Sequence, residues 1–231
     1  MIRLNRTLLC ALIAFSMFAV RAYADDKGPN TTKEAVKPTD KPTSVQTLKV
    51  AGDLAAWARS NHDPVGLAVA ARVLAADPPQ TMSNPNKTVG PGSGSSDVKA
   101  VAMDVTPGGL IAEAKQMAGD DKDSLSTISQ IEKNLPASRG HPGGAIMDRD
   151  ILPPGGSITY TISFVGGEPM EVVVFAAAPG LVDWHVYDEN GNEIQSEAGD
   201  HFVNMPRWTG AFHVVLTNAT SFPVPYTFAT N

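Results

Sequence analysis

The last third of the chain alternates apolar and polar residues, and this period of two constrains the fold more than any other feature. Between residues 158 and 164, Ile158, Tyr160, Ile162 and Phe164 alternate with threonine and serine, which is typical of a half-buried strand. The next run, 170–178, holds three consecutive valines and indicates a strand covered on both faces. Further short strands are expected at 182–187, 193–196, 202–205, 211–217 and 226–230. About seven short strands predict an antiparallel β-sandwich or jelly roll over residues 155–231.

The middle of the chain, residues 45–135, repeats apolar residues at helical spacing instead. Asp63 is a good N-cap and Pro64 fits the first helical position, so one helix ends and the next begins here. Trp57 is expected to anchor this first helical pair. Isolated helices of about 13 residues are marginal in water, so these helices are expected to pack on the sandwich or on a partner. Four helices are predicted, at about 45–60, 64–76, 106–117 and 121–133.

The predicted fold class is therefore α+β, with two short N-terminal αα-hairpins followed by a C-terminal antiparallel β-sandwich or jelly roll. Three segments lack either periodicity. Residues 25–44 are rich in Lys, Asp, Pro and Thr and predict a disordered spacer. Residues 77–97 are rich in Pro, Asn, Gly and Ser and predict a flexible linker, and residues 136–154 predict a loop.

The first 24 residues have the order of a secretory signal peptide. A basic start with Arg3 and Arg6 precedes an apolar run from Thr7 to Val20, and Ala22-Tyr23-Ala24 offers a cleavage site. The run is too short for a comfortable membrane span, which takes about 20 residues. We therefore expect an exported protein, periplasmic or secreted, with no transmembrane segment after leader cleavage.

Removal of the leader makes the chain strongly acidic. The leader contains three of the 18 basic residues and no acid, which leaves 15 Lys or Arg against 24 Asp or Glu, a net charge of −9. Such a chain is repelled by phosphate backbones and anionic lipid surfaces, so no nucleic acid partner is expected. Cys10, the single cysteine, leaves with the leader, so the mature chain has no disulfide and no cysteine metal ligand.

Three segments of the predicted sandwich form an ordered series: Asp183–Asn192, Trp208–Val215 and Pro225–Phe228. They contain an apolar-Tyr-Asp-x-x-Gly hairpin, a Gly-aromatic-x-aliphatic strand and a final Tyr-Thr strand. This series resembles the bacterial pre-peptidase C-terminal (PPC) domain, over about Gly155 to Asn231. The resemblance implies a non-catalytic β-sandwich attached to secreted proteins, which aids secretion or substrate attachment.

The sequence departs from that family in two ways. Only helices and linker precede the sandwich, where many members carry a protease. Some members bind calcium, but here the acidic cluster before the hairpin is replaced by Pro179-Gly180-Leu181-Val182. The resemblance therefore gives no support for a calcium site in this chain.

The motifs of common enzyme classes are missing from the sequence. There is no Gly-x-Ser-x-Gly elbow, and the glycine-rich run 90–94 lacks the strand, helix and Lys-Ser/Thr of a phosphate loop. No cofactor is expected. We predict an exported non-catalytic binding or accessory protein of the bacterial cell envelope, whose partner is an envelope protein or a polysaccharide.

Two alternatives name specific side chains. Trp208, Tyr187 and Arg207 predict a stacking surface for sugar rings, which makes the chain a polysaccharide-binding module, whereas Trp184 is expected in the core. The other alternative is a small metal-binding protein or enzyme, because two predicted strands direct histidines outward and a third lies nearby. Its ligands are His185, His201 and His213.

Overall fold

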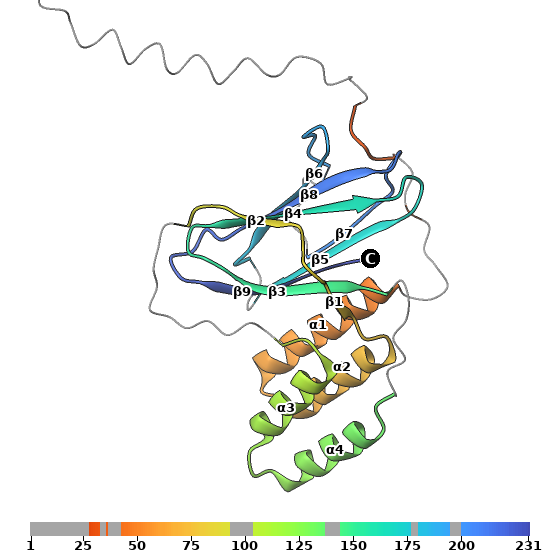
Figure 1. Cartoon of the computed structure of the whole chain (residues 1–231). Helices are drawn as coiled ribbons and strands as arrows, with labels where there is room; N and C mark the ends of the chain where they lie inside the picture. The colour runs from red at the N-terminus through yellow and green to blue at the C-terminus, as the bar shows by residue number, and fades with distance from the viewer. Residues whose placement is uncertain are drawn as a thin grey trace, which may run out of the picture.

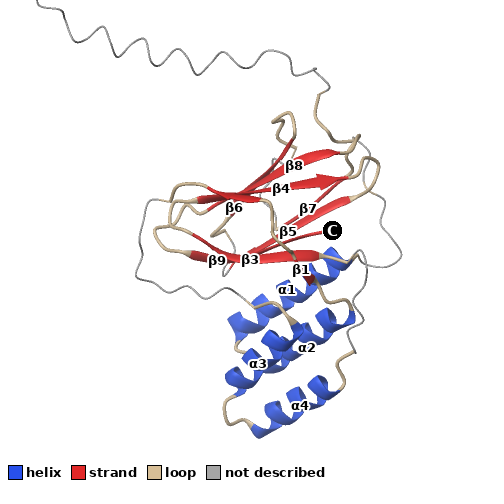
Figure 2. Ribbon diagram, viewed as in Figure 1, coloured by secondary structure: helices blue, strands red, loops and turns tan. Residues whose placement is uncertain are grey.

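The computed structural model describes residues 28–32, 36, 43–92, 104–136, 144–176, 180–194 and 200–231. The predicted leader, residues 1–24, lies outside the described residues. The described part forms three layers: a group of helices, a five-stranded sheet and a four-stranded sheet (Figures 1 and 2). The predicted α+β class is therefore confirmed.

The helices begin within one residue of their predicted starts. They are α1 (Ser44–Asn61), α2 (Pro64–Ala76), α3 (Pro107–Ala118) and α4 (Lys122–Lys133). The side chains of Asp63, Thr106 and Asp121 each accept a hydrogen bond from a first-turn N–H, which satisfies a donor that has no partner within the helix. Thr43 and Gln46 form a capping box at the start of α1. Within the described residues, no helix is long and apolar enough to cross a membrane.

The helical layer packs on the five-stranded sheet with α1 nearest to the strands and α4 farthest (Figure 1). Gly52 of α1 allows this close approach, because a Cβ there would lie 2.4 Å from the ring of Phe175. Trp57 does not anchor the helical pair, and that prediction is wrong: its side chain is 55% exposed. Buried alanines of α2, including Ala68 and Ala71, instead let the neighbouring helices come close.

The nine strands of the described residues form two sheets whose order is β1-β3-β9-β5-β7 and β2-β4-β8-β6. Every pairing is antiparallel except that of β1 with β3, which is parallel. The strands are β1 (Gln80–Thr81), β2 (Lys87–Val89), β3 (Ile146–Leu152), β4 (Ser157–Phe164), β5 (Met170–Ala176), β6 (Asp183–Asp188), β7 (His201–Asn204), β8 (Gly210–Thr217) and β9 (Val224–Thr230).

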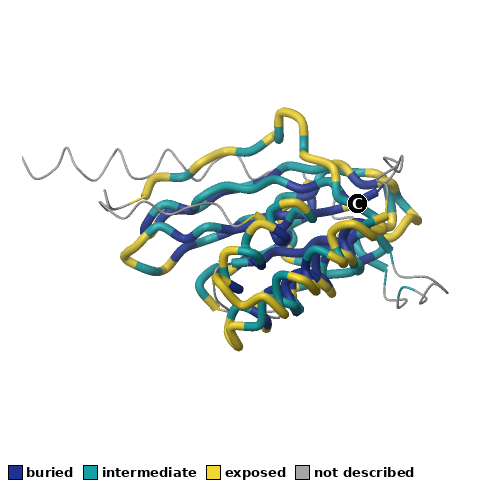
Figure 3. The backbone as a smooth tube through the Cα atoms, turned by 90° about the horizontal axis from the view of Figure 1, so that it is seen from below, coloured by how far each residue is buried: buried dark blue, intermediate teal, exposed yellow. Residues whose placement is uncertain are grey.

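Strand β5 is covered on both faces, as its run of valines predicts. Val172 and Val174 belong to the core between the two sheets, whereas Val173 and Phe175 belong to the core between the sheet and the helices. Trp184 is buried between the sheets, which confirms its predicted place in the core. Exposed residues are concentrated in the turns and on the outward side of the helices (Figure 3).

The predicted linker and loop contain strands that the sequence did not reveal. Residues 77–97 include β1 and β2, and residues 136–154 include β3; residues 93–97 and 137–143 lie outside the described part. Strands of two and three residues are too short to show a period of two. They form because the edges of β3 and β4 offer unpaired backbone groups to them.

The hairpin after β6 has the predicted turn, and Gly191 takes the positive φ of 79° that glycine tolerates. The strand expected at 193–196 is reduced to a bridge between Tyr187 and Glu193, and residues 195–199 lie outside the described part.

Candidate functional site

The four-stranded sheet directs one face into the sandwich core and the other away from it. Buried residues such as Val186 and Val214 alternate with partly exposed ones along β4, β6 and β8. The helices pack on the other sheet (Figure 2). Six of the partly exposed residues of these strands are called the outer face here: Thr159, Thr161, His185, Tyr187, His213 and Val215.

Strand register brings the predicted residues of the outer face together. Tyr187 pairs with His213, which pairs in turn with Thr161, and the Thr161 hydroxyl lies 3.1 Å from His213 Nδ1. The ring of His185 stacks on that of Tyr187 with 6.2 Å between centroids. The outward direction predicted for His185, His213 and Tyr187 is therefore confirmed.

Two carboxylates hold the imidazole of His185. Its Nδ1 lies 2.5 Å from Glu193 Oε1, and its Nε2 lies 3.3 Å from Asp183 Oδ2. The hydrogen bond to Glu193 is the main reason that the pKa of His185 is raised, and Asp183 adds to it. Both ring nitrogens are thus engaged with acids of this chain.

His201 is not part of the outer face. It lies on β7 of the five-stranded sheet, where its Nε2 is 3.5 Å from the buried carboxylate of Glu171. The structure therefore separates His201 from His185 and His213. Within the described residues, no group of three His, Cys, Asp or Glu side chains is placed to hold a metal ion.

Trp208 and Arg207 precede β8; their side chains contact each other, and that of Trp208 also contacts the β6 hairpin. The Arg207 guanidinium lies 5.3 Å from the centroid of the Trp208 ring. The indole N–H donates to Glu189 Oε1. Trp208 is thus held by its own neighbours, and the structure places it in the loop before β8 and Tyr187 on the outer face.

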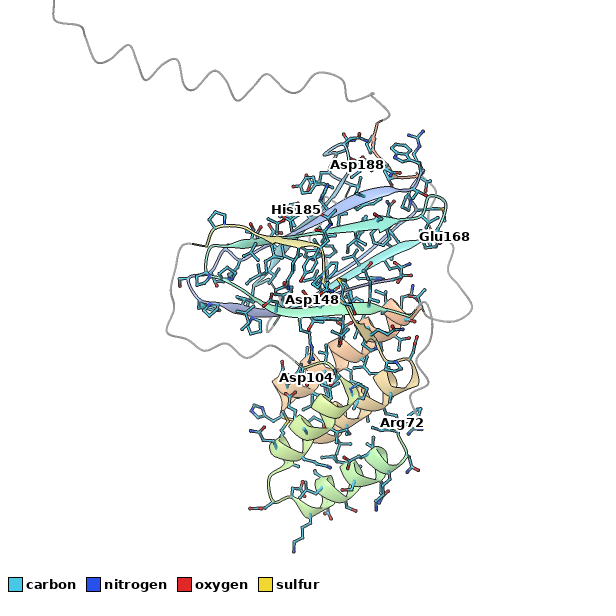
Figure 4. The ribbon with its side chains drawn as sticks, viewed as in Figure 1. Arg72, Asp104, Asp148, Glu168, His185 and Asp188 are labelled. Carbon is cyan, nitrogen blue, oxygen red and sulfur yellow. The ribbon has the colours of Figure 1, made fainter. Side chains whose placement is uncertain are left out.

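The same loop receives residues 28–32, which belong to the predicted disordered spacer. That prediction is wrong for these residues, because Asn30 is fully buried. The receiving surface, called the Asn30 groove here, lies at the end of the sandwich that is far from the helices, where Figure 4 labels Asp188. Its residues are Asp188, Glu189, Asn204, Met205, Arg207 and Trp208.

The sequence does not reveal the Asn30 groove, because the low hydrophobicity of the spacer predicts that it has no ordered contacts. Gly28-Pro29 is a turn signal, but Asn30-Thr31-Thr32 contains no large apolar side chain. The segment docks through hydrogen bonds, which composition does not reveal.

Asp188 organises the hairpin beside this groove. Its carboxylate accepts from the backbone N–H groups of Asn30, Asn190 and Asn192, each at 2.9 Å. Burial alone would raise the pKa of Asp188, but the hydrogen bonds from Asn192 and Asn30 outweigh it and hold that pKa below its ordinary value. Asp188 is therefore an ionised structural acceptor.

A second polar cluster joins the edges of the two sheets. Lys87 Nζ lies 2.6 Å from Asp148 and 2.7 Å from Asp150, and Tyr160 donates to Asp148 at 2.7 Å. The Tyr226 hydroxyl lies 2.6 Å from that of Tyr160, so Tyr226 is the donor of this pair because Tyr160 has a single proton. Burial is the main cause that raises the pKa of both tyrosines, so they stay protonated and serve as donors.

Comparisons with known proteins leave the family open. Neither a protein-family model nor a curated protein sequence matches the chain. A solved structure, the crystal structure of Aeromonas hydrophila PliG, a periplasmic lysozyme inhibitor of g-type lysozyme, is similar over 42% of this chain and 92% of that chain. The identity is 17% and the TM-score 0.33. The PPC resemblance therefore stays a prediction from the residues.

Proposed function

We propose that this chain is an exported, non-catalytic binding protein of the cell envelope that holds its partner on the outer face. The observation that carries the proposal is the asymmetry of the sandwich. The helical layer packs on one sheet through Phe175 and Val173, whereas the other sheet presents histidine, tyrosine and threonine side chains on a surface set by its own register.

The roles of three buried or partly buried acids support a non-catalytic function. Asp188 holds a turn, and Asp148 is paired with Lys87 and hydrogen-bonded by Tyr160. Glu171 accepts from Thr43, the cap of α1. Each of these acids contacts a structural donor, so the fold explains their burial without a reaction.

Polysaccharide is the finer hypothesis for the partner, and Tyr187 now carries it. A partly exposed aromatic ring beside hydroxyl and imidazole groups offers both stacking and hydrogen bonds to a sugar. Trp208 and Arg207 would contribute only if their contact with each other and the contact of Trp208 with Glu189 opened. The metal hypothesis retains His185 and His213 alone, and metal analysis of untagged protein tests it.

The test compares immobilised mature chains, residues 25–231, incubated with cell-envelope extract and, separately, with purified envelope polysaccharide. The outer-face variant is Tyr187→Ala combined with His213→Ala. The control is Arg72→Ala, an exposed residue of α2 in the helical layer (Figure 4). We expect the wild-type and control chains to retain a partner that the outer-face variant loses, with unfolding free energies within about 1 kcal/mol of each other.

The opposite pattern would refute the proposal. A partner that is lost from Arg72→Ala and kept by the outer-face variant would place binding on the helical layer. Retention by all three chains would also exclude the outer face.

A further inference from the structure

We infer that the Asn30 groove is a peptide-recognition site that takes a short segment with an asparagine side chain, and that the chain's own residues 28–32 now fill it. The site lies at the end of the sandwich and does not depend on the outer face. Its ligand class can be read directly, because one ligand is already bound in cis.

The groove recognises the carboxamide of Asn30 at both ends. Its Oδ1 accepts from the backbone N–H of Arg207 at 2.8 Å and from that of Trp208 at 3.1 Å. Its Nδ2 donates to the Trp208 carbonyl at 3.0 Å and to Glu189 Oε2 at 3.3 Å. The groove thus offers two donors to the carbonyl oxygen of the carboxamide and two acceptors to its NH₂ group.

This arrangement discriminates between side chains of similar size. An aspartate would direct an oxygen at the Trp208 carbonyl and the Glu189 carboxylate, where only a donor fits. A leucine would leave the two N–H groups of the loop without their acceptor in a buried place, which is costly. Asparagine is the residue type that satisfies all four partners.

The groove also binds the main-chain N–H groups of Asn30 and Thr32 and the hydroxyl of Thr31. The N–H of Asn30 donates to Asp188 Oδ2 at 2.9 Å, and the N–H of Thr32 donates to the Met205 carbonyl at 3.0 Å, just after β7. The Thr31 hydroxyl donates to Asn204 Oδ1 at 2.6 Å. Main-chain hydrogen bonds give affinity for a peptide largely without regard to its side chains, so the carboxamide contacts supply the selectivity.

The way the segment is held makes it exchangeable. Residues 28–32 contribute no side chain to either hydrophobic cluster, and a hydrogen bond contributes little net stability because it replaces one made to water. Tethering in cis gives the segment a local concentration on the order of millimolar. A peptide added in trans therefore competes poorly with the intact chain and well with a chain whose own asparagine is removed.

The test uses the mature chain with Asn30→Ala and a fluorescent peptide with the sequence of residues 25–36, followed by anisotropy. We expect saturable binding at least tenfold tighter than to the wild-type chain. The same peptide with aspartate in place of the asparagine should bind at least tenfold more weakly. In parallel, hydrogen exchange at the amides of Arg207 and Trp208 should speed up in Asn30→Ala and slow again when the peptide is added.

Two results would overturn the inference: no saturable binding to Asn30→Ala at millimolar peptide, or equal binding of the asparagine and aspartate peptides. If Asn30→Ala does not fold, the same titration of Thr32→Pro decides. That variant loses the one N–H donated to Met205 and keeps the carboxamide, so its cis segment is weakened but present. Peptide binding to Thr32→Pro tighter than to wild type supports the site, and its absence contradicts it.

Discussion

Replacing Gly166 with alanine is expected to destabilise the chain by about 3 kcal/mol. Gly166 lies in the turn between β4 and β5, pressed against the loop that carries Trp208. A Cβ at this position would lie 2.5 Å from Trp208 Cα, 2.6 Å from its carbonyl carbon and 2.7 Å from the nitrogen of Thr209. All three are backbone atoms, so no side-chain rotation relieves the clash.

The magnitude follows from the separation that the alanine imposes. Carbon atoms pack at about 3.5–4.0 Å, so the turn and the loop must move apart by about 1 Å. That movement stretches the bonds from Gly166 N to Thr209 Oγ1, 3.0 Å, and from Gly167 N to the Pro206 carbonyl, 2.8 Å. Overpacking costs about 1–3 kcal/mol, and each weakened hydrogen bond adds up to about 1 kcal/mol.

Urea unfolding of the mature chain measures this change, and the melting temperature should fall by about 6–12 °C for a chain of this size. Gly108→Ala in α3 is the matched control, because a Cβ there meets nothing within 4 Å. It should stabilise the chain by about 0.5–1 kcal/mol through helix propensity and the unfolded state. A Gly166→Ala chain as stable as the Gly108→Ala chain would show that the turn and the loop are not in contact.

The remaining predictions concern charge and exposure. Lys87→Met should lower the free energy of unfolding by about 1–3 kcal/mol, less than for a fully buried pair, because it leaves Asp148 without its cation. Lys115→Met breaks an exposed pair with Glu132 and should lower it by under about 1 kcal/mol. Equal losses of stability in the two variants would contradict the difference in burial between the pairs. His185 should titrate above its ordinary 6.5 in NMR, so the stability from its protonated form is complete below that pH and is lost as pH rises through the raised pKa. Glu193→Gln should lower the midpoint, and an unchanged midpoint would exclude the Glu193 contact as its cause. Trp57→Ala should change the unfolding free energy by less than about 0.5 kcal/mol, whereas a loss of 3 kcal/mol would show that the side chain is buried.

Most of the fold could be predicted because the local sequence signals for helices and strands agree with the burial of their side chains in the structure. Asp63 begins a helix where the sequence indicates, and the alternation from Ile158 to Phe164 matches the burial of β4 except at Ile162, which is only partly buried. The three valines of β5 predict a strand between two layers, and the structure supplies both layers. Each of these sequence signals lies within a few residues of the helix start or strand that it predicts.

The predictions that failed depend on contacts between distant segments. Trp57 satisfies the helical spacing of a core residue, but the small side chains of α2 fill that interface. Strand β2 exists because β4 pairs with it and because Asp148 and Asp150 bind Lys87. Asn30 is ordered by partners more than 150 residues away in sequence, which local composition does not contain.

Site-specific photo-crosslinking in intact cells tests the central claim, that the partner lies on the outer face, most directly. A benzophenone side chain replaces Tyr187 in one chain and Arg72, on the helical layer, in the other. We expect a discrete adduct from position 187 that is absent at position 72 and that disappears when His213→Ala is added. Adducts from position 72 alone, with none from position 187, would contradict the account and place the binding surface on the helices.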